Sequence, residues 1–192
     1  MKTIVTIMLL LTSMALWADK RPNILFFLVD DMGIGDTSVP FLYKDGESQK
    51  IDFNDLYRTP NMAKLAESGR VFTNAYSYSV CSPTRISLMT GQSAPRHRVT
   101  TWTHPKQSSI DTGLVKTGGI RSPADWRVRG LDHSLPLLPR LMKQTGYRTI
   151  FAGKAHFGPD DTPSGDPTNL GFDVNIAGFG GGGPGSYWGK YN

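Results

Sequence analysis

The sequence predicts an α/β fold with a mainly parallel sheet, and three features support this prediction. Residues 24–29 (Ile-Leu-Phe-Phe-Leu-Val) form an unbroken apolar run, which is typical of a strand buried on both faces. An acidic, glycine-containing segment, residues 30–36, follows directly, where open α/β sheets place their ligand sites. Helical and strand patterns then alternate along the chain. Its 192 residues are enough for one domain with a substantial core.

The first part of the chain continues with polar sequence and a clear helix signal. Residues 43–58 predict a surface loop, with a short helix around residues 53–57. Thr59-Pro60-Asn61 predicts the start of a helix that ends at Gly69. Residues 71–76 alternate loosely between apolar and polar side chains and predict a strand that leads to the single cysteine, Cys81.

The segment around Cys81 has the features of a site for an oxyanion ester. Ser82-Pro83 predicts a helix start, with a capping hydroxyl and a proline at the first helical position, and Gly91 predicts its end. Cys81 therefore lies at a helix N-terminus, where free N–H groups and the helix dipole favour an anion. Arg85 follows one turn later on the same face, so a nucleophile and a fixed cation lie within five residues.

Asp30 and Asp31 are candidate metal ligands. Neighbouring residues of a strand face opposite sides, so the two carboxylates can share an ion only if the strand has already ended, which Gly33 allows. Such oxygen ligands suit Ca²⁺ or Mg²⁺. The alternative is a pair of aspartates that cap a turn. We expect Asp36 to brace the loop rather than to bind metal.

The second half of the chain repeats the helix and strand pattern and ends in two further polar candidates. Residues 135–144 predict a helix, whose regular part must begin near Pro139 because proline disrupts a helix interior. Residues 147–152 predict a strand. Lys154 and His156 follow, and on an extended segment both point to one face, where a cation and a proton donor suit a sulfuryl group and its leaving oxygen.

Two sequence boxes resemble the signatures of the type I sulfatases. Cys81-Ser82-Pro83-Thr84-Arg85, followed by Leu88-Met89-Thr90-Gly91, resembles the first, and the glycine-flanked segments 146–149 and 153–156 resemble the second. The helix–strand–cysteine order before them is similar as well. The resemblance implies a three-layer α/β sandwich with a mainly parallel sheet, like that of alkaline phosphatase, and a sulfuric ester hydrolase.

The resemblance also implies a role for each candidate residue. Asp30 and Asp31 would hold a divalent ion, Ca²⁺ by analogy and Mg²⁺ as the alternative, together with Cys81 after its oxidation to formylglycine. Arg85 would steady the formylglycine hydrate, Lys154 the sulfuryl oxygens, and His156 would assist the release of sulfate. The implied partners are a sulfated small molecule or glycan, with carbohydrate esters favoured, and a formylglycine-generating maturation enzyme.

Composition and the N-terminus indicate an exported protein. The net charge of +5 and the pI near 9.4 come without any dense run of Lys or Arg, which argues against nucleic-acid binding. Residues 1–18 have the charged start, the short apolar run and the small residues of a signal peptide, so we expect a periplasmic or secreted protein with no membrane span after its removal. A single cysteine in such a protein forms no internal disulfide and is free for chemistry.

Residues 19–192 are then expected to be the N-terminal part of a catalytic domain, since the resembling family continues further and takes a second Asp-Asn pair, a histidine and a lysine from its later portion. We therefore expect a truncated chain of weak or no activity. The alternatives are a phosphate or phosphonate monoester hydrolase of the same superfamily, and a non-catalytic fragment that at most binds sulfated glycans.

Two regions are less informative. Residues 92–133, with Trp102, Trp126 and three histidines, predict an excursion over the active face, and each histidine is expected to be structural. The glycine-rich residues 178–185, followed by Tyr187 and Trp188, predict either a flexible linker or a loop that carries aromatic residues for sugar stacking.

Overall fold

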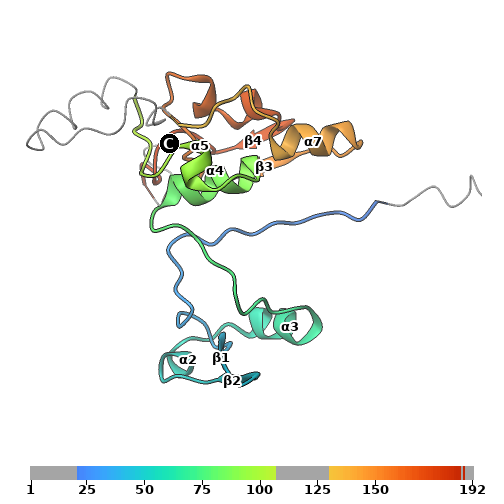
Figure 1. Cartoon of the computed structure of the whole chain (residues 1–192), viewed down its shortest axis with the longest axis vertical. Helices are drawn as coiled ribbons and strands as arrows, with labels where there is room; N and C mark the ends of the chain where they lie inside the picture. The colour runs from blue at the N-terminus through green and yellow to red at the C-terminus, as the bar shows by residue number, and fades with distance from the viewer. Residues whose placement is uncertain (1–20, 107–129, 187, 189–192) are drawn as a thin grey trace, which may run out of the picture. The chain divides into compact units, whose positions relative to one another are not determined.

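The structure of the chain is a computed structural model that describes residues 21–106, 130–186 and 188 (Figure 1). The predicted signal peptide, Trp126 and Tyr187 lie outside the described residues. The chain divides into two compact units, Met1–Leu65 and Ala66–Asn192. Within the described residues, none of the helices has the length and apolar character needed to cross a membrane.

The first unit contains a hairpin where the sequence predicted a loop. Strands β1 (Leu42–Lys44) and β2 (Glu47–Gln49) pair antiparallel, and the two residues between them, Asp45 and Gly46, both have positive φ, 55° and 87°. This backbone is that of the tight hairpin turn for which Asp-Gly is a strong sequence signal. The prediction of an irregular loop over residues 43–58 was therefore wrong in its first half.

The short helix α2 (Phe53–Leu56) confirms the prediction for the second half of that segment. Its Asn54 is buried and ties the unit together: the side-chain amide donates to the Thr37 carbonyl (2.8 Å), and its oxygen accepts from the Ile51 N–H (2.9 Å). Helix α3 (Pro60–Ser68) begins at the predicted proline. Thr59, just before it, accepts a hydrogen bond from the Ser38 N–H (2.9 Å).

Two predicted strands are absent from the described residues. Residues 24–29 form no strand, and their side chains are 40–81% exposed. Residues 71–76 likewise form none, and Phe72 and Tyr76 are exposed. An apolar pattern indicates that a segment favours burial, but a strand also needs a neighbour about 4.8 Å away to pair its backbone groups. The prediction of two regular strands was therefore wrong.

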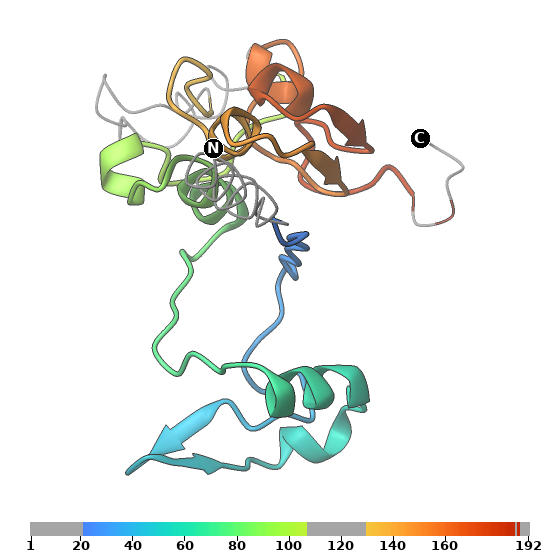
Figure 2. The same cartoon turned by 90° about the vertical axis from the view of Figure 1, so that its right-hand side faces the viewer.

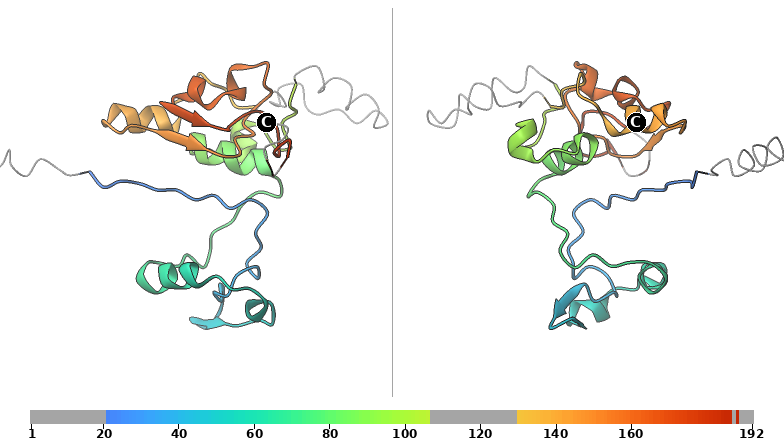
Figure 3. Two further views of the ribbon diagram at one scale, coloured as in Figure 1. Left: turned by 180° about the vertical axis from the view of Figure 1, so that it is seen from behind. Right: turned by 45° about the vertical axis from the view of Figure 1, so that its right-hand side comes forward.

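The second unit contains a pair of parallel strands, the type of pairing that the predicted sheet requires. Strands β3 (Ile150–Ala152) and β4 (Val174–Ile176) pair in parallel, with Phe151 opposite Asn175. The connection between them carries two 3₁₀ helices, η1 (Pro163–Gly165) and η2 (Pro167–Leu170). Figures 2 and 3 show this pair, with its orange and red arrows side by side, from further directions. The described residues thus form a mixed α/β arrangement with two short sheets.

Among the residues that the structure describes, three helices accompany this pair. They are α4 (Cys81–Thr90), α5 (Ala94–His97) and α7 (Leu138–Gln144), and α4 packs against both of the others. Pro139 lies in the first turn of α7, as predicted, because a proline there lacks only an N–H that would have no helical partner. The buried core of the unit joins α4 to the segments around α7 and β3; it consists of Ile86, Met89, Val99, Leu131, Leu137, Ala155, Phe157 and Leu170.

Candidate active site

Cys81 is the first residue of α4, which confirms its predicted place at a helix N-terminus. Val80 precedes it with extended backbone as the N-cap, and no side chain caps the helix. Gly91 ends the helix in the left-handed conformation (φ 65°), and its N–H donates to the Ser87 carbonyl (2.8 Å). The cysteine is therefore held at the start of a well-terminated helix, and it is half-buried.

Ser82 does not cap the helix, so that prediction was wrong. Its hydroxyl is fully buried and donates to the His156 carbonyl (3.0 Å), 74 residues away. The Thr103 N–H in turn donates to the same hydroxyl oxygen (3.1 Å). The physical reason is register: the helix begins two residues earlier than predicted, at Cys81 instead of Pro83, so Ser82 lies inside the first turn and faces the core.

Lys154, just after β3, contacts Cys81 directly. Its ammonium Nζ lies 3.2 Å from the Cys81 Sγ. Arg85, which is only 6% exposed, donates from Nη1 to the Lys154 carbonyl (2.6 Å). The structure thus brings together three of the predicted residues, Cys81, Arg85 and Lys154, and it assigns to Arg85 a contact with the backbone that the sequence did not suggest.

His156 lies in the same region but not by the predicted route. The prediction that Lys154 and His156 share one face required extended backbone through residue 156. The backbone there has a positive φ of 52°, so that prediction was wrong. The residue is 4% exposed, its N–H donates to the Phe179 carbonyl (3.1 Å), and its ring Nε2 lies 2.9 Å from the Thr103 carbonyl oxygen. Lys154 approaches the N-terminal turn of α4 with its side chain, and His156 approaches it with its backbone carbonyl.

The glycine-rich segment is packed against this histidine, so the prediction of a plain linker was wrong for its first part. Gly180 and Gly181 are buried, and the Gly180 N–H donates to the Asp160 carboxylate (2.5 Å). A Cβ on Gly182 would lie 2.9 Å from Cε1 of the His156 ring, which is closer than real Cβ contacts allow. The sequence did not single out Thr103 or Gly182. Both contact the His156 ring with backbone atoms, and a sequence pattern does not show where such atoms lie in the fold.

His97 has the structural role predicted for it. It is 4% exposed, its Nδ1 accepts from the Val99 N–H (3.2 Å), and its Nε2 lies 2.9 Å from the Ser87 Oγ. Burial lowers the pKa of His97 below its usual value, an effect that backbone hydrogen bonds partly oppose. The two hydrogen bonds fix the neutral ring, which joins α5 to α4.

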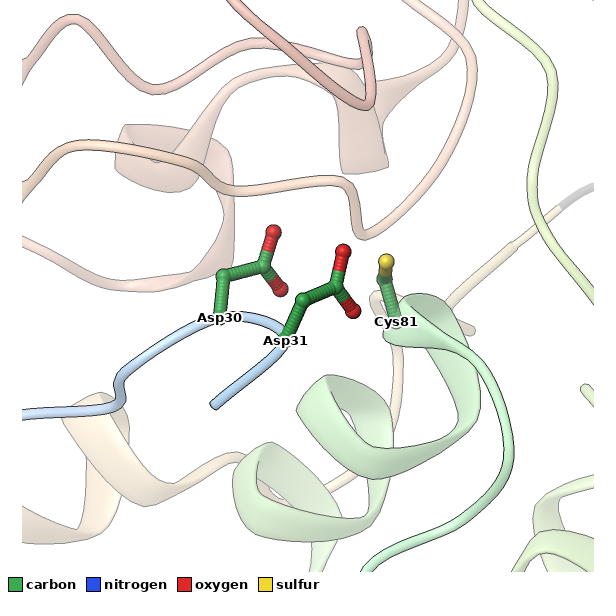
Figure 4. Close-up of side chains that lie close together, drawn as sticks. All are labelled: Asp30, Asp31 and Cys81. Carbon is green, nitrogen blue, oxygen red and sulfur yellow. The ribbon is translucent and has the colours of Figure 1, made fainter. Parts of the chain in front are cut away.

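The acidic pair lies in a turn within the first unit. Residues 30 and 31 are in turn conformation, and Asp31 has a positive φ of 54°. A ligand oxygen of Asp30 lies within 4.8 Å of one of Asp31, and Figure 4 shows both carboxyl groups directed to the same side of the chain. The two carboxylates can therefore face the same side because no strand runs through the pair, although the predicted strand before it is absent.

This geometry fits a divalent ion. Calcium binds oxygens at about 2.3–2.6 Å, so two of its ligands lie at most about 5 Å apart, and the spacing of the pair is within that limit. Asp36 braces the loop as predicted, since its carboxylate accepts from the Gly33 N–H (2.7 Å). A hydrogen bond to Asp36 raises the pKa of Tyr57 above its usual value. Asp30 and Asp31 belong to one unit and Cys81, also drawn in Figure 4, to the other.

Known proteins resemble this chain over most of its length. The family model for "Sulfatase" matches residues 22–184. Human N-acetylgalactosamine-6-sulfatase is 34% identical over 177 residues, which cover 91% of this chain and 28% of that protein. Human arylsulfatase D is 31% identical over 160 residues, which cover 80% of this chain and 22% of that protein.

Among solved structures, the crystal structure of Ps i-CgsB matches with a TM-score of 0.54 and 27% identity, over 83% of this chain and 29% of that one. The chain thus spans less than a third of the length of the curated relatives it matches. A match of the family model across 163 residues, from 22 to 184, includes both sequence boxes and all of the candidate residues. The chain belongs to the sulfatase family.

Proposed function

We propose that the protein hydrolyses sulfate esters with residue 81 in its formylglycine form and with a divalent ion. The observation that carries this proposal is the contact between the Lys154 ammonium and the Cys81 sulfur, 3.2 Å apart at the start of α4. A cation fixed beside the nucleophile position is what the negatively charged sulfuryl group requires as its bond to the leaving oxygen breaks.

The chain's own residues divide the work around that position. Lys154 binds the sulfuryl oxygens, and Arg85 keeps Lys154 in place through the 2.6 Å hydrogen bond to its carbonyl. The α4 N-terminus presents N–H groups to the anion. His156 moves a proton when sulfate is released, and its ring is held by the Thr103 carbonyl. Formylglycine at residue 81 would supply a hydrate with two hydroxyls: one would displace the alcohol from sulfur, and loss of a proton from the other would break the carbon–oxygen bond to sulfate and restore the aldehyde.

Asp30 and Asp31 are proposed to hold the ion, Ca²⁺ by preference and Mg²⁺ as the alternative, with residue 81 as a further ligand. The two carboxylates of the pair supply hard oxygen ligands, which favour these cations. When bound, the ion would neutralise sulfate oxygens and favour ionisation of the nucleophile.

We propose the substrate class, the partners and the location of the protein by analogy with its family. One relative is named for the 6-sulfate of N-acetylgalactosamine, which supports a sulfated carbohydrate as the substrate class. A formylglycine-generating enzyme would convert Cys81, and we propose export to the periplasm or beyond. In the complete catalytic unit we propose the three-layer sandwich with a mainly parallel sheet, and the parallel β3–β4 pair supports it.

Conversion and turnover test the proposal in sequence. The protein is co-expressed with a formylglycine-generating enzyme, and the peptide that contains residue 81 is analysed by mass spectrometry for loss of sulfur and gain of an aldehyde. In a version of the protein extended to the full length of its relatives, hydrolysis of an aryl sulfate is then compared with hydrolysis of the matching aryl phosphate, with and without a chelator. We expect conversion, preferential sulfate release and loss of activity on chelation.

The matched control is Cys81→Ala, which has no thiol to convert and should release no sulfate. A thiol that stays intact while a control substrate is converted would remove the proposed nucleophile. Faster turnover of the aryl phosphate would favour the phosphate or phosphonate monoester hydrolase instead.

A further inference from the structure

We propose that Ser82 and Thr103 are positioning residues that fix the tautomer of His156, with the proton on Nε2, so that Nδ1 is the ring nitrogen that gains and loses protons. This proposal deepens the proposed function, on which the proton-transfer role of His156 rests. The tautomer itself is a property of the folded chain and can be tested without turnover.

The tautomer follows from the partner of Nε2. That nitrogen lies 2.9 Å from the Thr103 carbonyl oxygen, and a carbonyl oxygen only accepts hydrogen bonds. Nε2 must therefore carry a hydrogen in both the neutral and the protonated ring. In the neutral ring the second nitrogen, Nδ1, is then the basic one, and any proton that His156 takes up arrives there.

The carbonyl that imposes this state is itself held by a cycle of hydrogen bonds. The Thr103 N–H donates to Ser82 Oγ (3.1 Å), and Ser82 Oγ donates to the His156 carbonyl (3.0 Å). The Thr103 hydroxyl lies 3.2 Å from Ser82 Oγ and 3.4 Å from the His156 carbonyl oxygen. Backbone and ring of His156 are thus both fixed by the same two residues.

Burial makes this cycle difficult to replace with water. Ser82 is 0% exposed, Thr103 is 2% exposed and His156 is 4% exposed. Removal of one buried partner leaves the others with unsatisfied polar groups, which costs more than the hydrogen bond contributes. Ser82 also follows Cys81 directly, so one helical turn presents the nucleophile position and orients the proposed proton carrier.

The chain contains a matched control in the same helix. Ser87 is the second α4 serine whose hydroxyl contacts a buried histidine, since its Oγ lies 2.9 Å from Nε2 of His97. Ser87→Ala removes an equal number of atoms from α4 but touches the other histidine. A general loosening of α4 would affect both histidines in both variants, whereas the proposed cycle predicts that each serine affects only its own.

The experiment is ring-nitrogen NMR of ¹⁵N-histidine-labelled protein at about pH 8, above the ordinary histidine pKa of about 6.5. His156→Gln assigns the His156 signals among those of the four histidines. We expect a protonated Nε2 and an unprotonated Nδ1 for His156 in the unaltered protein. Ser82→Ala should shift His156 toward a mixture of tautomers with the His97 signals unchanged. Ser87→Ala should shift the Nε2 signal of His97 with the His156 signals unchanged, because the Val99 N–H still fixes the tautomer of His97. Ser82→Thr should retain the single tautomer of His156.

A protonated Nδ1 on neutral His156 in the unaltered protein overturns the proposal, whether or not any variant folds. A His156 tautomer that is the same in Ser82→Ala as in the unaltered protein overturns the role of Ser82. If Ser82→Ala fails to fold, Thr103→Val, which keeps the carbonyl but removes the hydroxyl of the cycle, takes its place with the same two outcomes. Failure to hydrolyse sulfate esters would refute the proposed function and leave the tautomer result intact.

Discussion

The Lys154 ammonium donates a hydrogen bond to the Cys81 sulfur (3.2 Å) across 73 positions of sequence. The contact is possible because Arg85 and Ser82, on the inner face of α4, bind the carbonyls of Lys154 and His156. Two hydrogen bonds from one helix to one short segment fix both its ends. The cation therefore remains beside Cys81, the proposed nucleophile position, without relying on the flexible lysine stem alone.

Removal of this cation should reduce catalysis far more than binding. We expect Lys154→Met to lower kcat for an aryl sulfate by about 10²- to 10³-fold, the range found when one group that stabilises a developing anion is lost. Lys154→Arg keeps the charge and should retain more activity. Steady-state kinetics of the formylglycine-containing protein, extended to the full length of its relatives, measures this, and a Lys154→Met enzyme with unaltered kcat would contradict it.

Arg85 should contribute to stability as well as to the site. Its guanidinium is buried and donates a charged hydrogen bond to the Lys154 carbonyl, so Arg85→Met should lower the free energy of unfolding by about 2 kcal/mol. Arg148→Met, at an exposed position, is the control and should change it by no more than about 0.5 kcal/mol. Denaturant unfolding compares the two, and equal effects would refute the structural role of Arg85.

Protonation of His97 should destabilise the second unit. Because burial lowers its pKa in the folded state, the unfolded state binds more protons between the two pKa values, and stability falls as the pH drops below about 6.5. Protonation also removes the acceptor for the Val99 N–H. Denaturant midpoints measured from pH 8 to pH 5 should show this loss, and His97→Gln should flatten the slope. An identical slope in the variant would exclude His97 as its source.

Asp173 should set the stability at more acidic pH. The hydrogen bond from Lys143 and that from the Thr149 N–H lower the pKa of Asp173 to about 2. The stabilisation is present above the unfolded value of 3.8 and is lost as the pH falls through about 2. Asp173→Asn should therefore be less stable than the unaltered protein at neutral pH, and the difference should shrink between pH 4 and pH 2. Thermal unfolding across this range measures it.

Gly182 should tolerate no side chain where Gly183 does. A Cβ on Gly182 would lie 2.9 Å from the His156 ring, whereas a Cβ on Gly183 meets no atom within 4 Å. Gly182→Ala should displace the ring and lower kcat, by up to the 10²- to 10⁴-fold that proton transfer supplies. Gly183→Ala should leave it unchanged. Equal activity of the two variants would show that the glycine segment does not constrain His156.

Sequence patterns predicted the helix ends well, because the interactions that start and end a helix lie within a few residues of one another. The proline and glycine signals placed α3, α4 and α7 to within a few residues, because caps and breakers act on the backbone beside them. The start of α4 was misplaced by two residues, and because of that shift Ser82, predicted as a cap, is a buried donor. The Asp45-Gly46 turn is equally local, since Asp-Gly is a sequence signal for a hairpin turn, but the prediction of a loop did not include it.

Sheet formation was predicted less well because it is not local. Residues 24–29 are apolar enough for a central strand, but their side chains are exposed, and the described residues provide no pairing for them. β3 was predicted correctly, and its partner β4 lies 24 residues further on. No pattern within a strand specifies which neighbour will pair with it.

The sequence by itself determined the family and the helix that presents the cysteine, since residue identity and spacing carry that information. It also predicted the candidate residues Asp30, Asp31, Cys81, Arg85, Lys154 and His156. Only the tertiary structure decided that Arg85 holds a carbonyl, that Thr103 sets the environment of the His156 ring and that Gly182 packs against it. The physical reason is that these contacts use backbone atoms, which every residue possesses, so their partners are chosen by the folded path of the chain and not by side-chain type.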